Sequence, residues 1–240
     1  MSRWEPIRPV LDAFRGEQLK PSVILLSSTL LMVTWRYFGS TEFYLDRLSP
    51  RMLLWDDPAA TAAVYSFASC FVLLGVVPVL LIKLLFREKL GQYGAQLGDR
   101  ARTVRSILLL APLFVLGGYV ASKDPAVVAE YPINPRAGAS SAMFALHTCT
   151  YLLYYLGWEF HFRGFLQSGL RGTMGVTNAL LVQVLASTLL HIGKPDSEIY
   201  GAILGGILWG VLAYRTRSLL SGLVQHFALA VSLDWCICRL

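Results

Sequence analysis

The sequence predicts an all-α fold, a polytopic bundle of about seven transmembrane helices. Of the 240 residues, 55% are hydrophobic and only 15% are charged. A soluble domain carries about 25% charged residues. The mean hydropathy is +0.54, and the apolar residues gather in runs close to the roughly 20 residues that a spanning helix needs. We therefore expect an integral membrane protein surrounded by membrane lipid.

The predicted helices divide the chain into two main parts. Apolar segments occur at about residues 22–37, 61–86, 104–122, 141–170, 176–192, 199–215 and 218–235. We assign residues 1–21 to a cytoplasmic N-terminal segment, 22–122 to three helices with a basic linker at 87–103, and 141–235 to the helices that carry the candidate chemistry. All four histidines lie in this last part.

The basic residues lie mainly between the apolar segments and predict an orientation. If the N-terminus is cytoplasmic, fourteen Lys and Arg residues fall on the cytoplasmic side and seven on the other. This is the bias that orients membrane proteins. The net charge of +6 is therefore explained without nucleic acid, and we expect no nucleic-acid partner. The first twenty residues are rich in charge and lack an apolar stretch, so no cleavable signal peptide is predicted.

The stretch at residues 154–164 places three ionisable side chains, Glu159, His161 and Arg163, inside an apolar run. Such groups cost a few kcal/mol each in a membrane, so a cluster of them indicates a functional site. On a helix Glu159 and Arg163 share one face, whereas His161 points away. The Glu159–Arg163 pair is the predicted unit, and a purely structural ion pair is the alternative.

Two further predicted helices each contribute an imidazole. The fifth apolar segment ends near His191, and the seventh contains His226. Helical rise counted from the adjoining turns places both at depths from which they can line one cavity with Glu159. A carboxylate and two imidazoles suit hydrolysis, in which the carboxylate accepts a proton from water and the histidines hold the water and the oxyanion. Alternatively, Glu159, His191 and His226 bind a zinc ion, and the residue pattern leaves both mechanisms open.

These motifs, in this order, resemble those of the CPBP (ABI) family. The family contains the type II CAAX prenyl endopeptidases and bacterial proteins of bacteriocin processing and immunity. Its three motifs are Glu-Glu-x₃-Arg, Phe-x₃-His and His-x₃-Asn. The residues that match them here are Glu159, Arg163, His191 and His226. The resemblance covers about residues 141–235 and implies an intramembrane endopeptidase, possible zinc dependence and, for so short a chain, a bacterial cell membrane.

The sequence departs from the family pattern at three positions. Trp158 replaces the Glu that activates water, Ser187 replaces the Phe, and Ala230 replaces the Asn. Two residues are candidates to supply the missing carboxylate. Glu159 does so if its helix rotates slightly, since neighbouring residues are only about 100° apart. Glu198 does so if the segment after the second motif folds back into the cavity; a Glu at this place, after His-x₂-Lys-Pro, is a recurrent variant in the family.

The resemblance implies a role for each matched residue in cleaving a membrane-associated peptide or protein. Glu159 acts as general base or orients another base, and Arg163 fixes Glu159. His191 holds the attacking water, and His226 stabilises the oxyanion. The rival hypothesis is a catalytically inactive member that binds a partner in immunity or scaffolding. A transporter with a proton site is a third alternative, which the absence of repeated halves in the sequence disfavours.

Overall fold

The computed structural model describes residues 7–49 and 57–239, which are mostly helical and contain no strand. The predicted all-α fold class is confirmed, although residues 1–6 of the predicted N-terminal segment lie outside the described part. The α-helices are α1 (Arg8–Asp12), α2 (Leu19–Phe38), α3 (Thr41–Phe43), α4 (Pro58–Cys70), α5 (Val77–Leu80), α6 (Arg100–Ala121), α7 (Pro125–Glu130), α8 (Ser141–Glu159), α9 (Gly169–Leu189), α10 (Asp196–Thr216) and α11 (Leu220–Ile237). π-helical turns join α4 to α5, extend α5 to Phe86, and join α8 to α9.

The number of membrane spans differs from the prediction. Within the described residues, five helices are long and apolar enough to cross a membrane: Pro58–Phe86, Arg100–Ala121, Ser141–Leu189, Asp196–Thr216 and Leu220–Ile237. The helices Gly16–Phe38 and Thr41–Leu48, bent by 49°, add a sixth if they form one span. The predicted seven is not confirmed by this count, which takes Ser141–Leu189 as a single stretch of 49 residues. Two helices meet at a kink inside that stretch. Only Gly175, at φ 76° and ψ 166°, leaves the helical conformation inside it.

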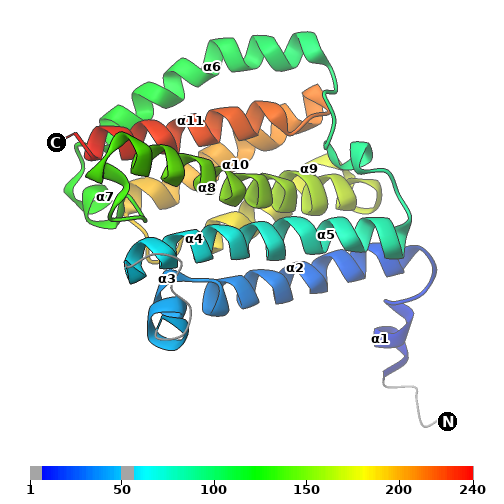
Figure 1. The fold of residues 1–240 in the computed structure, drawn as a ribbon. Helices are drawn as coiled ribbons and strands as arrows, with labels where there is room; N and C mark the ends of the chain where they lie inside the picture. The colour runs from blue at the N-terminus through cyan, green and yellow to red at the C-terminus, as the bar shows by residue number, and fades with distance from the viewer. Residues whose placement is uncertain (1–6, 50–56, 240) are drawn as a thin grey trace.

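The long helices lie side by side as a bundle (Figure 1). In it α8 contacts both α4 and α11, α9 contacts α2 and α10, and α6 packs along α11. Two glycines allow the closest approaches. A Cβ atom added at Gly157 of α8 would lie 2.7 Å from the carbonyl oxygen of Cys70, and one added at Gly118 of α6 would lie 2.6 Å from that of Leu229. Small residues at such contacts let helix backbones pack closely, as in other membrane bundles.

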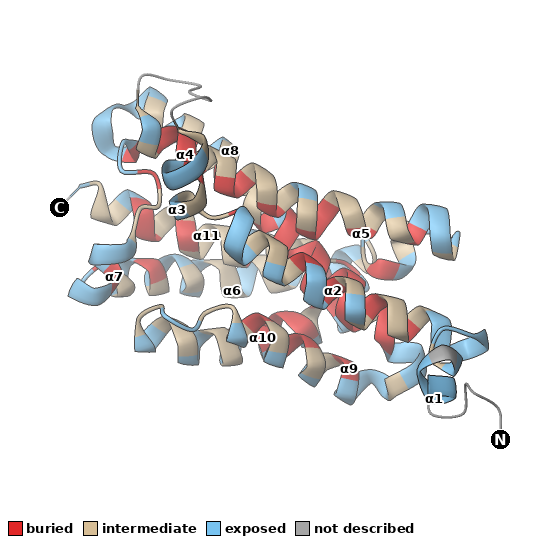
Figure 2. Ribbon diagram, turned by 90° about the horizontal axis from the view of Figure 1, so that it is seen from below, coloured by how far each residue is buried: buried red, intermediate tan, exposed pale blue. Residues whose placement is uncertain are grey.

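The centre of the core is the aromatic-rich turn that follows α8. Trp158, Phe162 and Phe165 are buried there, and buried positions face the interior of the bundle in Figure 2. In contrast, α6 turns apolar side chains such as Leu108 and Leu113 outward, where each is more than 60% exposed. An outer surface of this kind is expected where helices contact lipid rather than water. The chain is thus built as an integral membrane protein.

The connections alternate between two ends of the bundle (Figure 1). At one end, here called the linker end, residues 87–99 meet the turn before α11. There the Ser218 hydroxyl donates to the Gln96 carbonyl over 2.6 Å, and the Leu219 amide donates to the Gly94 carbonyl over 3.0 Å. The opposite end, here called the far end, contains α3, α7 and the turn between α9 and α10. These turns at the far end carry several of the candidate residues.

Candidate active site

Glu159 and Arg163 pair as their spacing predicts. Arg163 Nη1 lies 3.4 Å from Glu159 Oε1, and both side chains are 2% exposed. The chain leaves α8 at Glu159 and continues as a π-helical turn through Ser168. Such turns are rare and often occur at functional sites, because they shift side chains relative to a regular helix.

Glu159 also holds His226 of α11. His226 Nδ1 donates to Glu159 Oε1 over 2.8 Å, because a carboxylate oxygen can only accept. The Trp209 ring stacks on the imidazole with its centroid 4.1 Å away, and the Arg163 guanidinium lies over the same indole at 5.5 Å. A Cβ atom added at Gly222 would lie 2.9 Å from Glu159 Oε2. Both polar partners of Glu159 thus meet Oε1, whereas Oε2 is buried without a hydrogen-bond partner and is confined by Gly222.

His191 lies in the turn that follows α9. Its Nδ1 donates to the Ser187 carbonyl over 2.8 Å, so in the neutral ring Nε2 carries the free lone pair. Burial lowers the pKa of His191 below its ordinary value, and the Arg163 and Lys194 charges act in the same direction. The hydrogen bond to Ser187 and the Glu198 charge oppose this change. The ring is thus neutral at pH 7, with Nε2 able to accept a hydrogen bond.

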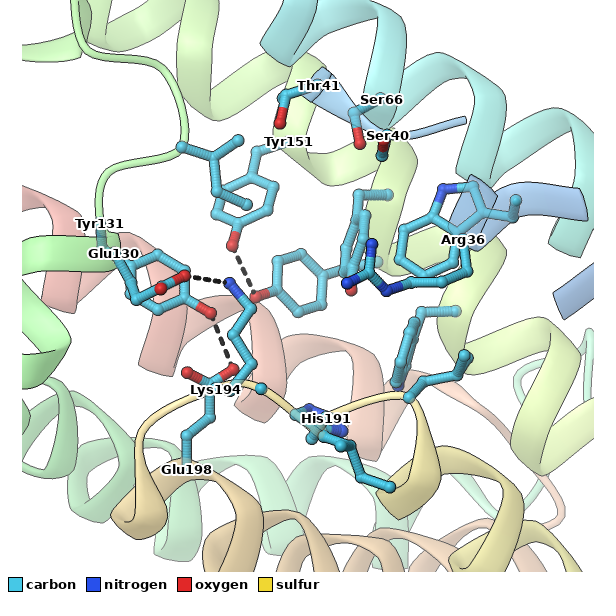
Figure 3. Close-up of a pocket in the computed structure, with 18 of the residues that line it drawn as sticks. Arg36, Ser40, Thr41, Ser66, Glu130, Tyr131, Tyr151, His191, Lys194 and Glu198 are labelled. Atoms are coloured by element: carbon cyan, nitrogen blue, oxygen red, sulfur yellow. Dashed lines mark hydrogen bonds and ion pairs between the residues drawn. The ribbon is translucent and has the colours of Figure 1, made fainter. Parts of the chain in front are cut away.

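Glu198 is in the first turn of α10 and has one free oxygen. The Tyr131 hydroxyl donates to its Oε1 over 2.8 Å, whereas Oε2 is buried without a hydrogen-bond partner. Next to it, Lys194 pairs with Glu130 over 2.8 Å and lies over the Tyr131 ring. Figure 3 shows Glu198, Lys194 and His191 around the same space. A buried carboxylate oxygen without a partner is costly unless water or a ligand meets it.

Two cavities meet at these residues. The first has a volume of about 370 Å³ and a wall of polar and aromatic side chains from the far end, among them Thr41, Glu130 and Tyr154. The second is an apolar groove of about 450 Å³, which runs along α6, α10 and α11 past Gly117 and Gly205. The side chains that line both are Tyr131, Tyr151, Tyr155, His191, Glu198 and His226.

The geometry can now be compared with known proteins. Residues 139–232 match the family model described as Type II CAAX prenyl endopeptidase Rce1-like. These residues are similar to that family, and the match covers less than half of the chain. No curated protein and no solved structure matches the chain. The family model confirms the resemblance inferred from the motifs, and at family level the domain is CAAX-protease-like.

Within the matched residues, the two candidate carboxylates occupy different places. Glu198 lines both cavities, whereas Glu159 lines neither, although we expected it to share a cavity with the histidines. The physical reason is the angle between neighbours on a helix. Trp158 faces the polar cavity, with its ring centroid 5.4 Å from that of His191, and Glu159 is turned toward His226.

The position of Glu159 outside the two cavities also affects the hypothesis that Glu159, His191 and His226 bind a zinc ion. Among residues 7–49 and 57–239, no three His, Cys, Asp or Glu side chains come together in a group that could hold a metal ion. Glu159 and His226 form a pair, but Glu159 lines neither of the cavities that His191 lines. The residues present do not fit a three-ligand zinc centre, and we assign no catalytic step to a metal.

A stripe of buried polar residues on α8 was missed by the sequence reasoning. His147, Tyr151, Tyr155, Glu159 and Arg163 follow one another at intervals of four and are all at most 5% exposed. The Tyr155 and Tyr151 hydroxyls lie 3.3 Å apart, and the Tyr155 ring packs edge-on against the imidazole of α11. The repeat of polar residues at every fourth position was the available signal, because i,i+4 residues share a helix face.

The two remaining polar features of the domain lie outside the catalytic constellation. His147 Nε2 and Asp234 Oδ2 are 2.7 Å apart, and both side chains are buried. Asp234 is therefore a paired core residue rather than the interfacial one that its position near the end of the last helix suggests. His161 packs among Phe162 and Phe165, away from the ion pair, as predicted.

Proposed function

We propose that this protein is an intramembrane endopeptidase that hydrolyses a peptide bond in a membrane-associated peptide or protein. The observation that supports it is the juxtaposition of unpaired groups in one cavity. His191 contributes Nε2 and Glu198 contributes Oε2, and neither atom has a hydrogen-bond partner. His226 contributes its Nε2, because its Nδ1 is bound to Glu159. An acceptor, a base and an imidazole facing one space are the parts that water-driven hydrolysis needs.

In the proposed first step, a water molecule is held between His191 Nε2 and the Glu198 carboxylate. Glu198 accepts a proton from this water while the oxygen attacks the carbonyl carbon of the scissile bond. The electron pair of the carbonyl double bond moves to its oxygen. A positioned general base of this kind contributes about 10²–10⁴-fold to the rate.

In the second step, His226 carries the developing charge. Its Nδ1–H is held by the Glu159 carboxylate, which favours the imidazolium form. In this proposal His226 enters the reaction as the imidazolium, so its Nε2–H donates a hydrogen bond to the oxyanion and the ring keeps both protons throughout. Arg163 holds Glu159 in place. When the tetrahedral intermediate collapses, the C–N bond breaks and Glu198 returns its proton to the leaving nitrogen. The products are a carboxylic acid and an amine, and transfer of the acid proton to the amine gives a carboxylate and an ammonium group.

Glu159 and Glu198 are the two residues that could replace the missing Glu of the family motif, and we choose Glu198 as the general base. Glu159 as general base would require it to release His226 and turn past Trp158, at the cost of leaving a buried Arg163 without its partner. If Glu159 instead orients His226, its side chain stays where it is, because the hydrogen bond between them is already formed. We therefore give the base role to Glu198 and the orienting role to Glu159.

One observation favours the rival, an inactive binding protein. Trp158 stands where the family has its water-activating Glu, and its ring packs edge-on against His191. An aromatic wall next to the imidazole suits the binding of an apolar peptide side chain. The cavity beside Trp158 nevertheless keeps a volume of about 370 Å³, which is far above the space that one water molecule needs.

The test is cleavage of a library of transmembrane and CAAX-type peptides by purified protein in detergent. His191→Ala is expected to lose turnover by about 10²-fold or more, and a chelator is expected to change nothing. Glu17→Gln, which alters an exposed carboxylate at the linker end, is the control and should retain activity. Peptide binding without turnover by the folded wild type would favour the inactive binding protein.

A further inference from the structure

We infer that the polar cavity opens on the side of the membrane away from the cytoplasm, so that the substrate is a peptide segment that has already crossed the membrane. The inference rests on the proposed function, which it deepens by naming where the substrate lies. It starts from the distribution of charge between the two ends of the bundle.

The linker end is strongly basic. Twelve of the described Lys and Arg residues lie there, six of them between residues 83 and 105. The other six are Arg8, Arg15, Lys20, Arg171, Arg215 and Arg217. The described acidic residues at this end number four. Ion pairs involve only part of this charge, through contacts such as Lys20–Glu88 at 2.8 Å and Arg102–Asp99 at 3.3 Å.

The far end has the opposite balance. Its described basic residues are Arg36, Arg47, Lys123, Arg136, Lys194 and Arg239. Eight described Asp and Glu residues lie at the same end. Short connections rich in Lys and Arg stay in the cytoplasm, and the two-to-one excess at the linker end therefore assigns that end to the cytoplasm.

The mouth of the polar cavity belongs to the far end. Its rim comes from α3, α7 and the turn after α9, represented by Thr41, Glu130 and Lys194 (Figure 3). Glu198 lies in the first turn of α10, just inside this rim. At the linker end, by contrast, the linker is held by hydrogen bonds to the turn before α11. The apolar pocket of about 370 Å³ beside it reaches Glu159 but is not lined by His191, His226 or Glu198. A water-soluble or membrane-surface peptide therefore reaches the catalytic groups from the far side.

The chemistry of the rim fits such a substrate. Glu130, Lys194 and the exposed Arg36 supply charges of both signs around the cavity, and Figure 3 shows the Arg36 side chain reaching into it. Groups of this kind bind the polar backbone of an extended peptide. The adjoining apolar groove along α6, α10 and α11 holds the membrane-embedded part of the same molecule. The substrate class is a translocated peptide or protein segment next to its membrane anchor.

The test measures the accessibility of single cysteines in intact cells. In a variant whose four native cysteines are replaced, Ala101→Cys marks the linker end, Ala139→Cys marks the far end, and Thr41→Cys marks the cavity rim. Residues 101 and 139 are both exposed, which makes them a matched pair. A membrane-impermeant maleimide is expected to modify residues 139 and 41 from outside, and to modify residue 101 only after the membrane is permeabilised.

The reverse labelling pattern, or labelling of both ends from outside, would overturn the inference. If the cysteine-free variant does not fold, a reporter fused after Arg239 in the native chain gives the same information. A phosphatase that is active only outside the cytoplasm is expected to be active there, and a fluorescent protein that matures only inside is expected to stay dark. Orientation does not affect peptide cleavage in detergent, so failure of the proposed function leaves these labelling results unchanged.

Discussion

Glu159 and Glu198 are two buried carboxylates beside histidines, yet their surroundings differ. Glu159 is bound by His226 and Arg163 and confined by Gly222. Glu198 has one bond from Tyr131 and lines both cavities. Each carboxylate has one oxygen, Oε2, without a hydrogen-bond partner, but only that of Glu198 belongs to a side chain that lines the cavities of the histidines. The comparison teaches that the carboxylate with the most partners is suited to hold other groups in place. The carboxylate that lines the cavities of the histidines is suited to exchange a proton.

The largest expected difference between the two is in stability. Glu159→Ala leaves the buried Arg163 charge without its partner, which is expected to cost about 3–5 kcal/mol of unfolding free energy. Glu198→Ala removes one hydrogen bond at the cavity wall, which is expected to cost about 1 kcal/mol. Thermal unfolding in detergent compares the two variants. Equal losses of stability would contradict the assignment of Glu159 as the residue that orders the site.

A smaller effect is expected from crowding Glu159 without removing it. Gly222→Ala places a methyl group 2.9 Å from Glu159 Oε2 and should shift the carboxylate and His226 together. Since misplacement by about 1 Å can cost about 10²-fold in rate, we expect turnover to fall by roughly 10-fold. Gly172→Ala is the control, because nothing lies within 4 Å of its added Cβ and the residue lines neither cavity. Unchanged turnover in Gly222→Ala would show that the position of Glu159 is unimportant for hydrolysis.

The smallest expected effect is on the pH dependence. The mechanism needs neutral His191, and burial lowers the pKa of this residue. Activity should therefore persist below the ordinary histidine pKa of about 6.5 and fall only as the pH drops through the lowered value. Lys194→Met removes a positive charge that lowers this pKa, so the acid limb of kcat/KM should move to higher pH by a few tenths of a unit. Lys123→Met, a neutralised lysine elsewhere at the far end, should leave the limb in place.

Much of the fold and part of the site follow from local sequence. The all-α class follows from composition, and the Glu159–Arg163 pair follows from i,i+4 spacing, because both depend on one helix at a time. The bond between His226 and Glu159 depends on how two helices are rotated against each other, which spacing along the chain does not encode. The same is true of the contact between Tyr131 and Glu198, which joins a loop to a distant helix.

The number of spans depends on how the chain is divided at one residue. The apolar runs on either side of Gly175 are two helices that meet at a kink, where Gly175 alone leaves the helical region, and a count that takes Ser141–Leu189 as one stretch therefore gives fewer than the predicted seven. A run of apolar residues reports hydrophobicity and length, whereas the end of a span depends on backbone geometry at a single glycine. The sequence likewise does not fix how the helix is rotated about its axis. A rotation of about 100° decides whether Glu159 or Trp158 faces the cavity.

The measurement that tests the central claim most directly is single-turnover cleavage by Glu198→Gln and Glu159→Gln, with thermal unfolding of each protein in the same detergent. We expect Glu198→Gln to keep wild-type stability and lose about 10²-fold or more of its cleavage rate. Glu159→Gln should lose stability and retain part of its rate. Full activity in a folded Glu198→Gln, together with an inactive but stable Glu159→Gln, would contradict the account and make Glu159 the base.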